Sequence, residues 1–254
     1  MKLPLIRPDW PVPPGVGAAM SLRDGGVSTG SWCSLNLGVG VGDDPLAVAE
    51  NRARWAAALG ARPVWLRQVH GIHVMRLGAH SPDAPEEPAD AAWTTEPGIA
   101  CNVQVADCLP VLFAASDGRA VAAAHAGWRG LAAGVLETTL DALRQGAGIA
   151  AAEVVAWLGP CIGPRQFEVG ADVLEGFGQT PGQADPASFV FSPRRGGAAR
   201  WRADLQRLAY LRLAAAGVVH ISQNAACTAE DGSRFFSFRR DGVTGRLAAA
   251  VWRR

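Results

Sequence analysis

The chain has 254 residues, 49% of them hydrophobic, and its formal net charge is +1 at pH 7. This length supports one large core or two small ones, and without a polar linker or an abrupt change in composition we expect a single domain over residues 1–254. The nearly balanced charge argues against a nucleic-acid-binding surface. No stretch approaches the ~18 apolar residues of a membrane helix, and prolines interrupt the apolar N-terminal segment that a signal peptide needs. We therefore expect a cytoplasmic monomer with no nucleic-acid or membrane partner.

Three helices are predicted. Asp44-Pro45 is typical of an N-cap followed by proline at the first helical position, and Gly60 is typical of a helix end, so the first helix is predicted over residues 45–59. Apolar patterns predict the other two over residues 130–144 and 204–216.

Strands are interspersed with these helices, and at least two pairs look antiparallel. They are predicted over residues 64–77 with a break near Gly71, 99–105, 109–115, 119–125, 154–158, 218–221, 235–239 and 247–252, the last two as a hairpin. Residues 78–90, rich in proline and acidic side chains, are predicted as a surface loop. This mixture favours a mixed-sheet α/β or α+β fold.

The segment from residue 108 to 125 brings a cysteine to a histidine. Asp117-Gly118 is a strong two-residue hairpin signal between two apolar strands. With this turn His125 faces Pro110, and Cys108 lies two positions away in register on the opposite strand. Residues two apart on paired strands share a face, so the thiol and the imidazole become diagonal neighbours. A one-residue slip of the register would put them on opposite faces.

Such a pair has three interpretations. It is a buried cysteine beside a core histidine, a thiol nucleophile activated by an imidazole, or part of a metal site. His70 is the best candidate for a third ligand, because it is expected to share a strand face with Gln68 and is followed by Gly71, which allows close approach of the backbone. Two imidazoles and one thiolate suit Zn²⁺ and leave one position open, as in catalytic zinc sites.

An anion site is predicted beside this pair. His125 is followed by Ala-Gly-Trp-Arg-Gly and then by the predicted helix over 130–144. A glycine-rich turn that enters a helix exposes N–H groups at the positive end of the helix dipole. Arg129 in this turn adds a planar fork suited to phosphate or carboxylate.

Several strings resemble those of the YfiH-like, laccase-domain family: QVHG (68–71), ADCLPVLF (106–113), HAGWRG (125–130), GPCIGP (159–164) and FFSFRRDGVTGR (235–246). The matches run in order over nearly the whole chain and are together highly specific. The resemblance implies an α/β fold whose mixed sheets pack between helical layers, in the order α/β/β/α. It also implies that His70, Cys108 and His125 are the metal ligands.

The family that the chain resembles is associated with zinc-dependent purine nucleoside phosphorylase activity on adenosine, inosine and methylthioadenosine, and with adenosine deamination. It was first named for polyphenol oxidation with copper, and editing of peptidoglycan precursors has been proposed for some members. The resemblance therefore implies an enzyme that uses zinc, with copper as the alternative metal, and purine nucleosides and phosphate as substrates.

Phosphorolysis requires phosphate near the anomeric carbon of the sugar and stabilisation of charge on the leaving purine. The residues predicted to contact substrate are Arg23, Ser34, Asn36, Arg52, Asp107 and Arg129. Asp107 is the carboxylate nearest to the metal ligands, and either acts as general acid and base or orients the turn. The family usually has two threonines before the arginine that corresponds to Arg23; here Ser21-Leu22 precedes it, which lowers the affinity for phosphate if the missing hydroxyl holds that anion.

Three other functions stay open. Copper polyphenol oxidation is disfavoured because laccase chemistry requires several coppers with many histidine ligands, whereas the chain has 5 histidines. A cysteine hydrolase using Cys108 and His125 predicts a reactive thiol without metal dependence, and a cysteine-hydrolase toxin shares the family's fold. A non-enzymatic zinc protein would need a fourth ligand from Asp107 or Cys161.

Overall fold

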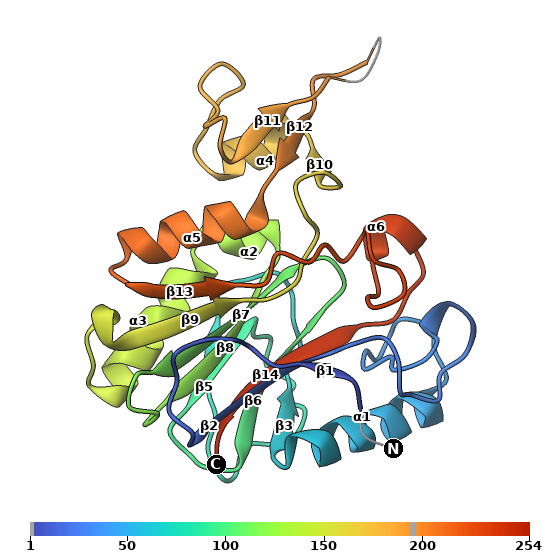
Figure 1. The fold of residues 1–254 in the computed structure, drawn as a ribbon, viewed down its shortest axis with the longest axis vertical. Helices are drawn as coiled ribbons and strands as arrows, with labels where there is room; N and C mark the ends of the chain where they lie inside the picture. The colour runs from blue at the N-terminus through green and yellow to red at the C-terminus, as the bar shows by residue number, and fades with distance from the viewer. Residues whose placement is uncertain (1–2, 194–196) are drawn as a thin grey trace.

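Two β-sheets pack face to face and helices cover the outer face of each, so the elements form four layers (Figure 1). The computed structural model describes residues 3–193 and 197–254. The order helix, sheet, sheet, helix confirms the layered α/β fold with mixed sheets. The organisation of residues 1–254 as one domain stays a prediction.

The first sheet has five strands in the order β1-β2-β14-β6-β3. Their bounds are β1 Leu5–Ile6, β2 Val16–Ser21, β14 Leu247–Arg253, β6 Ile99–Val105 and β3 Arg62–Trp65. Neighbouring strands are antiparallel except β3 and β6, which are parallel. The C-terminal strand β14 therefore lies in the middle of this sheet.

The second sheet has six strands in the order β13-β9-β7-β8-β5-β4. Their bounds are β13 His220–Gln223, β9 Val154–Leu158, β7 Leu109–Ala115, β8 Val121–Ala126, β5 Ala91–Thr94 and β4 Val74–Arg76. The central pairs are antiparallel, whereas the two edge strands β13 and β4 run parallel to their neighbours.

Alternation along the strands divides the core into three layers of side chains. In β14, Leu247, Ala249 and Val251 pack between the two sheets, whereas the residues between them pack against α1 (Pro45–Leu59). The central strands of both sheets are buried on both faces in this way. This explains why their sequences are almost continuously apolar.

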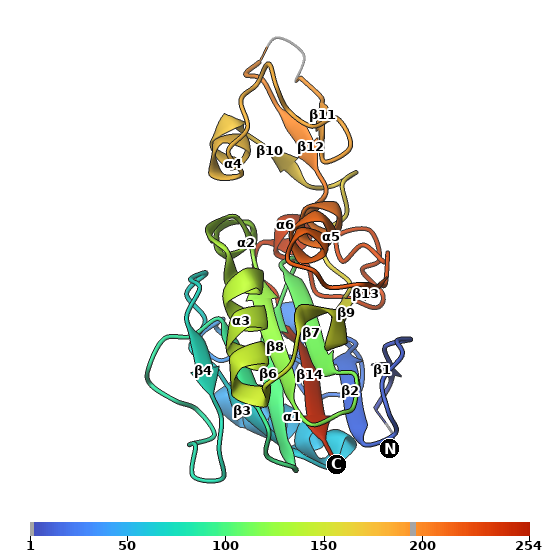
Figure 2. The same ribbon diagram turned by 90° about the vertical axis from the view of Figure 1, so that its left-hand side faces the viewer.

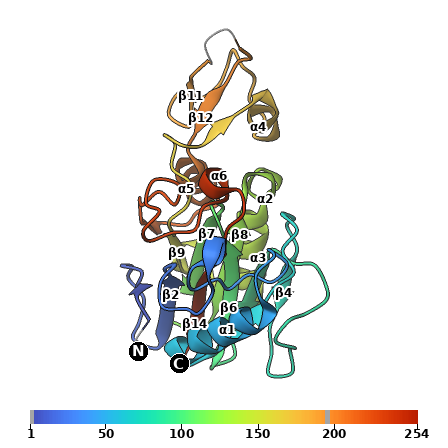
Figure 3. The same cartoon turned by 90° about the vertical axis from the view of Figure 1, so that its right-hand side faces the viewer.

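Helix α1 begins and ends as predicted. The Asp44 side chain accepts a hydrogen bond from the N–H of Leu46 at 3.0 Å, and Gly60 ends the helix with a φ of 65°. The fully buried Trp55 donates from its indole N–H to Asn102 on β6 at 3.0 Å. These contacts hold α1 along the outer face of the five-stranded sheet (Figure 3).

Helices α3 (Val135–Ala147) and α5 (Leu205–Ala215) cover the outer face of the six-stranded sheet (Figure 2). The predicted helix over 130–144 is wrong in one respect, because α2 (Trp128–Ala133) is separated from α3. Gly134 between them has a φ of 104°, a left-handed conformation that ends the first helix, and the second helix begins at the next residue.

The predicted C-terminal hairpin is also wrong. Phe235 and Phe236 lie in a loop and pack their rings into the core between the sheets, and Ser237 caps the short helix α6 (Phe238–Asp241). The aromatic residues imitate a strand pattern because they are buried, although their backbone is not paired. Strand β14 instead pairs with β2 and β6.

The predicted strand over 64–77 is two short strands joined by a crossover. β3 belongs to the first sheet and β4 to the second, so the chain between Trp65 and Val74 passes from one sheet to the other. Strand β13 begins two residues later than the predicted strand over 218–221. The crossover is the segment that carries His70.

A small third sheet projects beyond the sandwich (Figures 1 and 2). It contains β10 (Glu168–Val169), β12 (Trp201–Ala203) and β11 (Phe189–Phe191), with α4 (Ala171–Gly176) beside it. Two 3₁₀ turns, Gly30–Trp32 and Ala151–Glu153, complete the elements of the described residues. No helix within residues 3–193 and 197–254 is both long and apolar enough to cross a membrane.

Candidate metal centre and its cavity

The β7–β8 hairpin has the predicted register. Pro110 faces His125 and Leu109 faces Ala126, so Cys108 precedes the first paired residue of β7. On β7 the even-numbered residues Leu112 and Ala114 face the core between the sheets, and Cys108 shares their face. On β8 the odd-numbered residues Val121 and Ala123 face the same core, as does His125. Both functional side chains therefore point to the space between the sheets at the open end of the hairpin.

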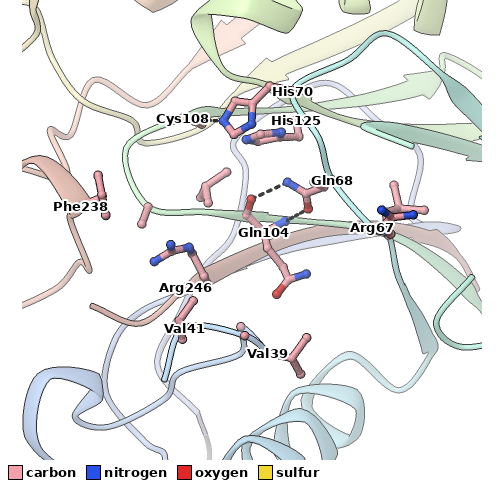
Figure 4. A pocket seen from close by; sticks show the side chains of 15 residues that line it. Val39, Val41, Arg67, Gln68, His70, Gln104, Cys108, His125, Phe238 and Arg246 are labelled. Carbon is pink, nitrogen blue, oxygen red and sulfur yellow. Dashed lines mark hydrogen bonds between the residues drawn. The ribbon is translucent and has the colours of Figure 1, made fainter. Parts of the chain in front are cut away.

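His70 joins this pair from the crossover. One ligand atom of each of His70, Cys108 and His125 lies within 4.8 Å of the others, and the Cys108 Sγ lies 3.7 Å from the His70 Nε2. The two imidazole rings have centroids 4.8 Å apart and meet edge to face (Figure 4). We call these three residues the triad. Their convergence is as the sequence predicts, and their role as metal ligands stays a proposal.

The position of His70 differs from the expected one. It lies in a loop and not on a strand face shared with Gln68, and its φ is 62°. A left-handed conformation at a residue with a side chain needs support from its surroundings. Here the carboxylate of Asp90 accepts the N–H groups of Val69, His70 and Gly71 at 3.0, 2.9 and 2.7 Å.

Asp90 also holds the second histidine. Its carboxylate lies 2.8 Å from the His125 Nδ1, and its backbone carbonyl accepts the His125 N–H at 2.7 Å. Because Nδ1 is engaged, Nε2 is the nitrogen left to bind an ion, as in carboxylate–histidine–zinc arrangements. Sequence reasoning missed Asp90, because it ends the acidic segment 78–90 that reads as a surface loop, whereas its side chain is buried.

The charges of the triad are coupled. Burial raises the pKa of the Cys108 thiol, but the neighbouring charge of His125 and hydrogen bonds to His125 and His70 outweigh burial and lower this pKa to about 6. Burial lowers the pKa of His125, yet Cys108 and Asp90 raise it above its ordinary value. In the metal-free chain the cysteine is therefore a thiolate at neutral pH, which is the form that binds metals.

Two glycines leave room for the triad and the crossover beside α2. A Cβ on Gly127 would lie 2.5 Å from the His70 Cδ2 and 3.0 Å from the Cys108 Sγ. A Cβ on Gly130 would lie 2.9 Å from the carbonyl oxygen of Gly71. The glycines of the string HAGWRG are therefore required for close packing of the crossover against the start of α2.

Asp107 orients the loop that carries Cys108. Its carboxylate accepts hydrogen bonds from the Thr228 hydroxyl at 2.6 Å, the Ser237 hydroxyl at 3.0 Å and the backbone N–H of Arg239 at 2.7 Å. Among the described residues neither Asp107 nor Cys161 joins the triad as a fourth ligand. An ion bound by the triad would therefore keep one coordination position open, which disfavours a purely structural zinc site.

The triad opens onto a cavity of about 590 Å³, within the size range of small-molecule sites. In Figure 4 the triad lies above Gln104. Arg246 lies below the triad and beside Gln104, toward the segment from Val39 to Val41. Cavity-lining residues are Gly38, Val39, Gly40, Val41, Leu66, Arg67, Gln68, His70, Gln104, Val105, Ala106, Cys108, His125, Phe238 and Arg246. Outside the triad, sequence reasoning identified none of them as substrate contacts.

Two glutamines shape the middle of this cavity. The Gln68 side chain donates to the backbone carbonyl of Gln104 at 2.9 Å and accepts the backbone N–H of Gln104 at 2.7 Å. The crossover is therefore tied to β6 beside the triad (Figure 4). The Gln104 side chain accepts a long hydrogen bond of 3.5 Å from Arg52 behind it.

None of the six residues predicted to contact substrate lines this cavity. Arg23 donates to the carbonyls of Cys33 and Gly232. Arg52 stacks 3.9 Å from the centre of the Trp65 ring, and burial lowers the pKa of its guanidinium to about 10. Arg129 is exposed, lies over the ring of its neighbour Trp128 and does not line the triad's cavity.

The other predicted contacts support the cavity wall from behind. The Ser34 hydroxyl binds the backbone of Arg23 and Gly26. Asn36 is fully buried, and its Oδ1 accepts the N–H groups of Gly38 and Arg246 at 2.9 and 2.8 Å. Direct contact of these residues with substrate stays a prediction that the geometry of the cavity does not favour.

The donor set of the triad fits a transition-metal ion. Ligand atoms on one tetrahedral zinc lie roughly 3.3–3.6 Å apart, given bond lengths of about 2.0–2.3 Å. The triad atoms lie within 4.8 Å of one another, so small side-chain rotations bring them onto one ion. Two imidazoles, a thiolate and a buried carboxylate behind one imidazole are typical of zinc.

The fold is that of a known family. The chain belongs to the family described as multi-copper polyphenol oxidoreductase laccase, whose model matches residues 17–254. It is 49% identical over 247 residues, 97% of each chain, to a Pseudomonas aeruginosa protein named purine nucleoside phosphorylase. It is 48% identical over 250 residues, 98% of each chain, to Escherichia coli YfiH, also named purine nucleoside phosphorylase. The crystal structure of a Neisseria meningitidis protein, 41% identical, matches with a TM-score of 0.88 over 98% of each chain.

Proposed function

We propose that the chain is a zinc-dependent purine nucleoside phosphorylase for adenosine, inosine and methylthioadenosine, with adenosine deamination as a minor activity of the same site. The observation that carries this proposal is the convergence of His70, Cys108 and His125 on a cavity large enough for a small-molecule substrate. The names of two relatives that cover almost the whole chain support the reaction class.

In phosphorolysis a phosphate oxygen forms a bond to C1′ of the ribose while the bond from C1′ to the purine nitrogen breaks. The purine leaves with the electron pair of that bond and takes up a proton, and ribose 1-phosphate is the second product. The cavity must therefore hold a nucleoside and a phosphate side by side, and stabilise the negative charge of the phosphate and the charge that develops on the leaving purine.

Zinc held by the triad would supply a Lewis acid with one position open to water or a substrate oxygen. The chain's own residues prepare this arrangement. Asp90 engages the Nδ1 of His125 and fixes the backbone of His70, so two of the three ligands share one buried anchor. Gln68 ties the crossover to β6 and keeps the cavity wall beside the triad in place.

Phosphorolysis is favoured over deamination by the cavity wall. In deamination water adds at C6 of adenine and ammonia leaves, and zinc deaminases use a glutamate beside the metal to move the protons. Among the described residues that line the cavity, none carries a carboxylate. Deamination here would have to move its protons through other groups, so we place it second.

The test is to purify the protein without added metal, measure bound zinc and copper, and supply adenosine or inosine with and without phosphate. We expect about one zinc per chain and equal amounts of free base and ribose 1-phosphate only when phosphate is present. Cys108→Ala should lose both the zinc and the activity. Cys33→Ala, which removes an exposed cysteine outside the cavity, is the matched control and should keep both. Wild-type protein that binds zinc but releases no base with phosphate would refute the proposal.

A thiol hydrolase is the second candidate, because one observation favours it. Cys108, His125 and Asp90 have the order of nucleophile, base and orienting carboxylate. This function predicts that the chelated, metal-free protein keeps its activity and that iodoacetamide abolishes it. The zinc enzyme predicts the reverse dependence on chelation, with activity restored by added zinc.

A multi-copper oxidase is not supported by the ligands present. Within the described residues the triad is the single cluster of three or more side chains suited to hold a metal ion. One such cluster accommodates one ion, whereas laccase chemistry needs several coppers.

A further inference from the structure

Arg246 lies on the cavity wall and has no assigned role. It directly precedes β14 and is half-buried. Figure 4 shows its guanidinium below the triad and beside Gln104, on the side toward Phe238. The other arginine on the wall, Arg67, is exposed and donates to the carbonyl of Glu86 at 3.3 Å.

Arg246 is held at three points. Its backbone N–H donates to the buried Asn36 side chain at 2.8 Å. Its Nη1 donates to the carbonyls of Thr244 and Gly245 at 3.0 and 3.1 Å. Its aliphatic stem packs on Gly38, where a Cβ would lie 2.5 Å from the Arg246 Cγ. The side chain is therefore pre-organised and not a freely moving surface arginine.

One edge of the guanidinium is left free. In the part of the chain that the structure describes, Nε and Nη2 make no hydrogen bond or ion pair, whereas Nη1 is engaged twice. Nε and Nη2 form the side-on edge that binds two oxygens of a phosphate or carboxylate with parallel hydrogen bonds. Because the carbonyls of Thr244 and Gly245 bind only Nη1, the Nε–Nη2 edge of Arg246 stays available to a ligand in the cavity.

The surroundings favour an anion at this edge. Burial lowers the pKa of the Arg246 guanidinium against the opposing effect of Cys108 and Asp107, so this cation is partly removed from water. An arginine is almost never fully buried without a partner, and partial burial carries a smaller cost of the same kind. The carboxylate of Asp107 is already bound by Thr228, Ser237 and Arg239. A charged ligand in the cavity would complete the pairing.

We propose that Arg246 binds inorganic phosphate through its Nε–Nη2 edge and so places this co-substrate on the opposite side of the cavity from the triad. The assignment rests on the proposed function, since phosphate is the co-substrate of a phosphorylase. Asn36, which sequence reasoning made a substrate contact, becomes the residue that positions Arg246.

The test compares Arg246→Met and Arg246→Lys with wild type at saturating inosine. We expect the KM for phosphate to rise about 10- to 100-fold in Arg246→Met, the range for loss of a charged hydrogen-bonding partner. Arg246→Lys should fall between, because an ammonium keeps the charge but not the fork. The KM for inosine at saturating phosphate and the bound zinc should stay within about twofold of wild type. Arg119→Met, at the far end of the β7–β8 hairpin, is the matched control and should leave the phosphate KM unchanged.

Direct binding separates this proposal from the proposed function. Calorimetry with inorganic phosphate should show binding to wild type and at least tenfold weaker binding to Arg246→Met, whether or not any nucleoside is cleaved. An unchanged phosphate KM and affinity in both variants would overturn the proposal, as would a rise confined to the KM for inosine.

A measurement on the wild-type protein covers the case in which a variant does not fold. An arginine-directed dicarbonyl reagent should modify Arg246, and saturating phosphate should slow this reaction several-fold while Arg119 reacts at an unchanged rate. Peptide mapping identifies both positions. Equal rates with and without phosphate would contradict the assignment.

Discussion

The cavity has two walls that differ in charge and in how they are supported. On one wall the triad brings together a thiolate and two imidazoles, and a buried carboxylate, Asp90, holds the two histidines from behind. On the other wall a guanidinium is held by a neutral amide, Asn36, and by backbone carbonyls. The first wall suits a cation and the second suits an anion.

The supports follow the charge that each wall has to hold. A carboxylate behind an imidazole favours metal binding, because it orients the ring and offsets the charge of the ion. A carboxylate behind Arg246 would neutralise the guanidinium, whereas a neutral amide leaves its charge available to a ligand. In both walls the supporting residue lies far in sequence from the residue that it holds.

Gly127→Ala should have the largest effect, and it should disrupt only the wall that carries the triad. The added methyl group would lie 2.5 Å from the His70 ring and displace it. A displacement of about 1 Å at a reacting centre costs about 100-fold in rate, so we expect a loss of this order in kcat/KM together with loss of zinc. Phosphate affinity by calorimetry should be unchanged.

The matched control for Gly127→Ala is Gly78→Ala, where the added methyl group meets open space. That variant should retain zinc and activity. Full zinc occupancy in Gly127→Ala would show that the triad does not hold the metal as we propose.

Asp90→Asn should weaken the same wall without a steric clash. Loss of the carboxylate that holds His125 and the His70 loop should lower zinc affinity about 10- to 100-fold. Competition with a chromophoric chelator measures this change. Asp83→Asn, in the same loop but with an exposed side chain paired to Arg62, is the control and should bind zinc as wild type does.

The pH dependence of Cys108 alkylation in metal-free protein measures the ionisation of this thiol. Because its pKa is lowered to about 6, raising the pH from 5 to 7 should increase the thiolate fraction, and so the rate, about tenfold. Peptide mapping separates Cys108 from the exposed Cys33. A midpoint near the ordinary value of 9.0 would contradict the coupling of Cys108 to His125.

Asn36→Ala should have the smallest effect on catalysis and act on the other wall. Arg246 keeps its charge but loses its anchor, so the phosphate KM should rise about 3- to 10-fold, and the loss of buried hydrogen bonds should cost about 1–3 kcal/mol of stability. Asn102→Ala removes a similarly buried amide, which is bonded to Trp55 and to neither Asn36 nor Arg246. It should cost similar stability by thermal melting without changing the phosphate KM.

Much of the fold could be predicted because its signals are local. The cap at Asp44 and the glycine at Gly60 define α1 from adjacent residues, and the Asp117-Gly118 turn sets the register that brings Cys108 to His125. The failed prediction of a C-terminal hairpin shows the limit of such signals. Phe235 and Phe236 are apolar because they are buried in the inter-sheet core, and burial alone does not distinguish a loop from a strand.

The sequence by itself determined the triad and the layered fold, the first from the hairpin register and the family motifs, the second from those motifs. Only the tertiary structure decided which polar residues support the site and which line it. Asp90 and Arg246 look like surface residues in sequence, and Arg129 looks like an anion ligand. A side chain's role in a cavity depends on which segments fold against it, and the crossover at His70 and the packing of Arg246 on Gly38 join residues that no local pattern connects.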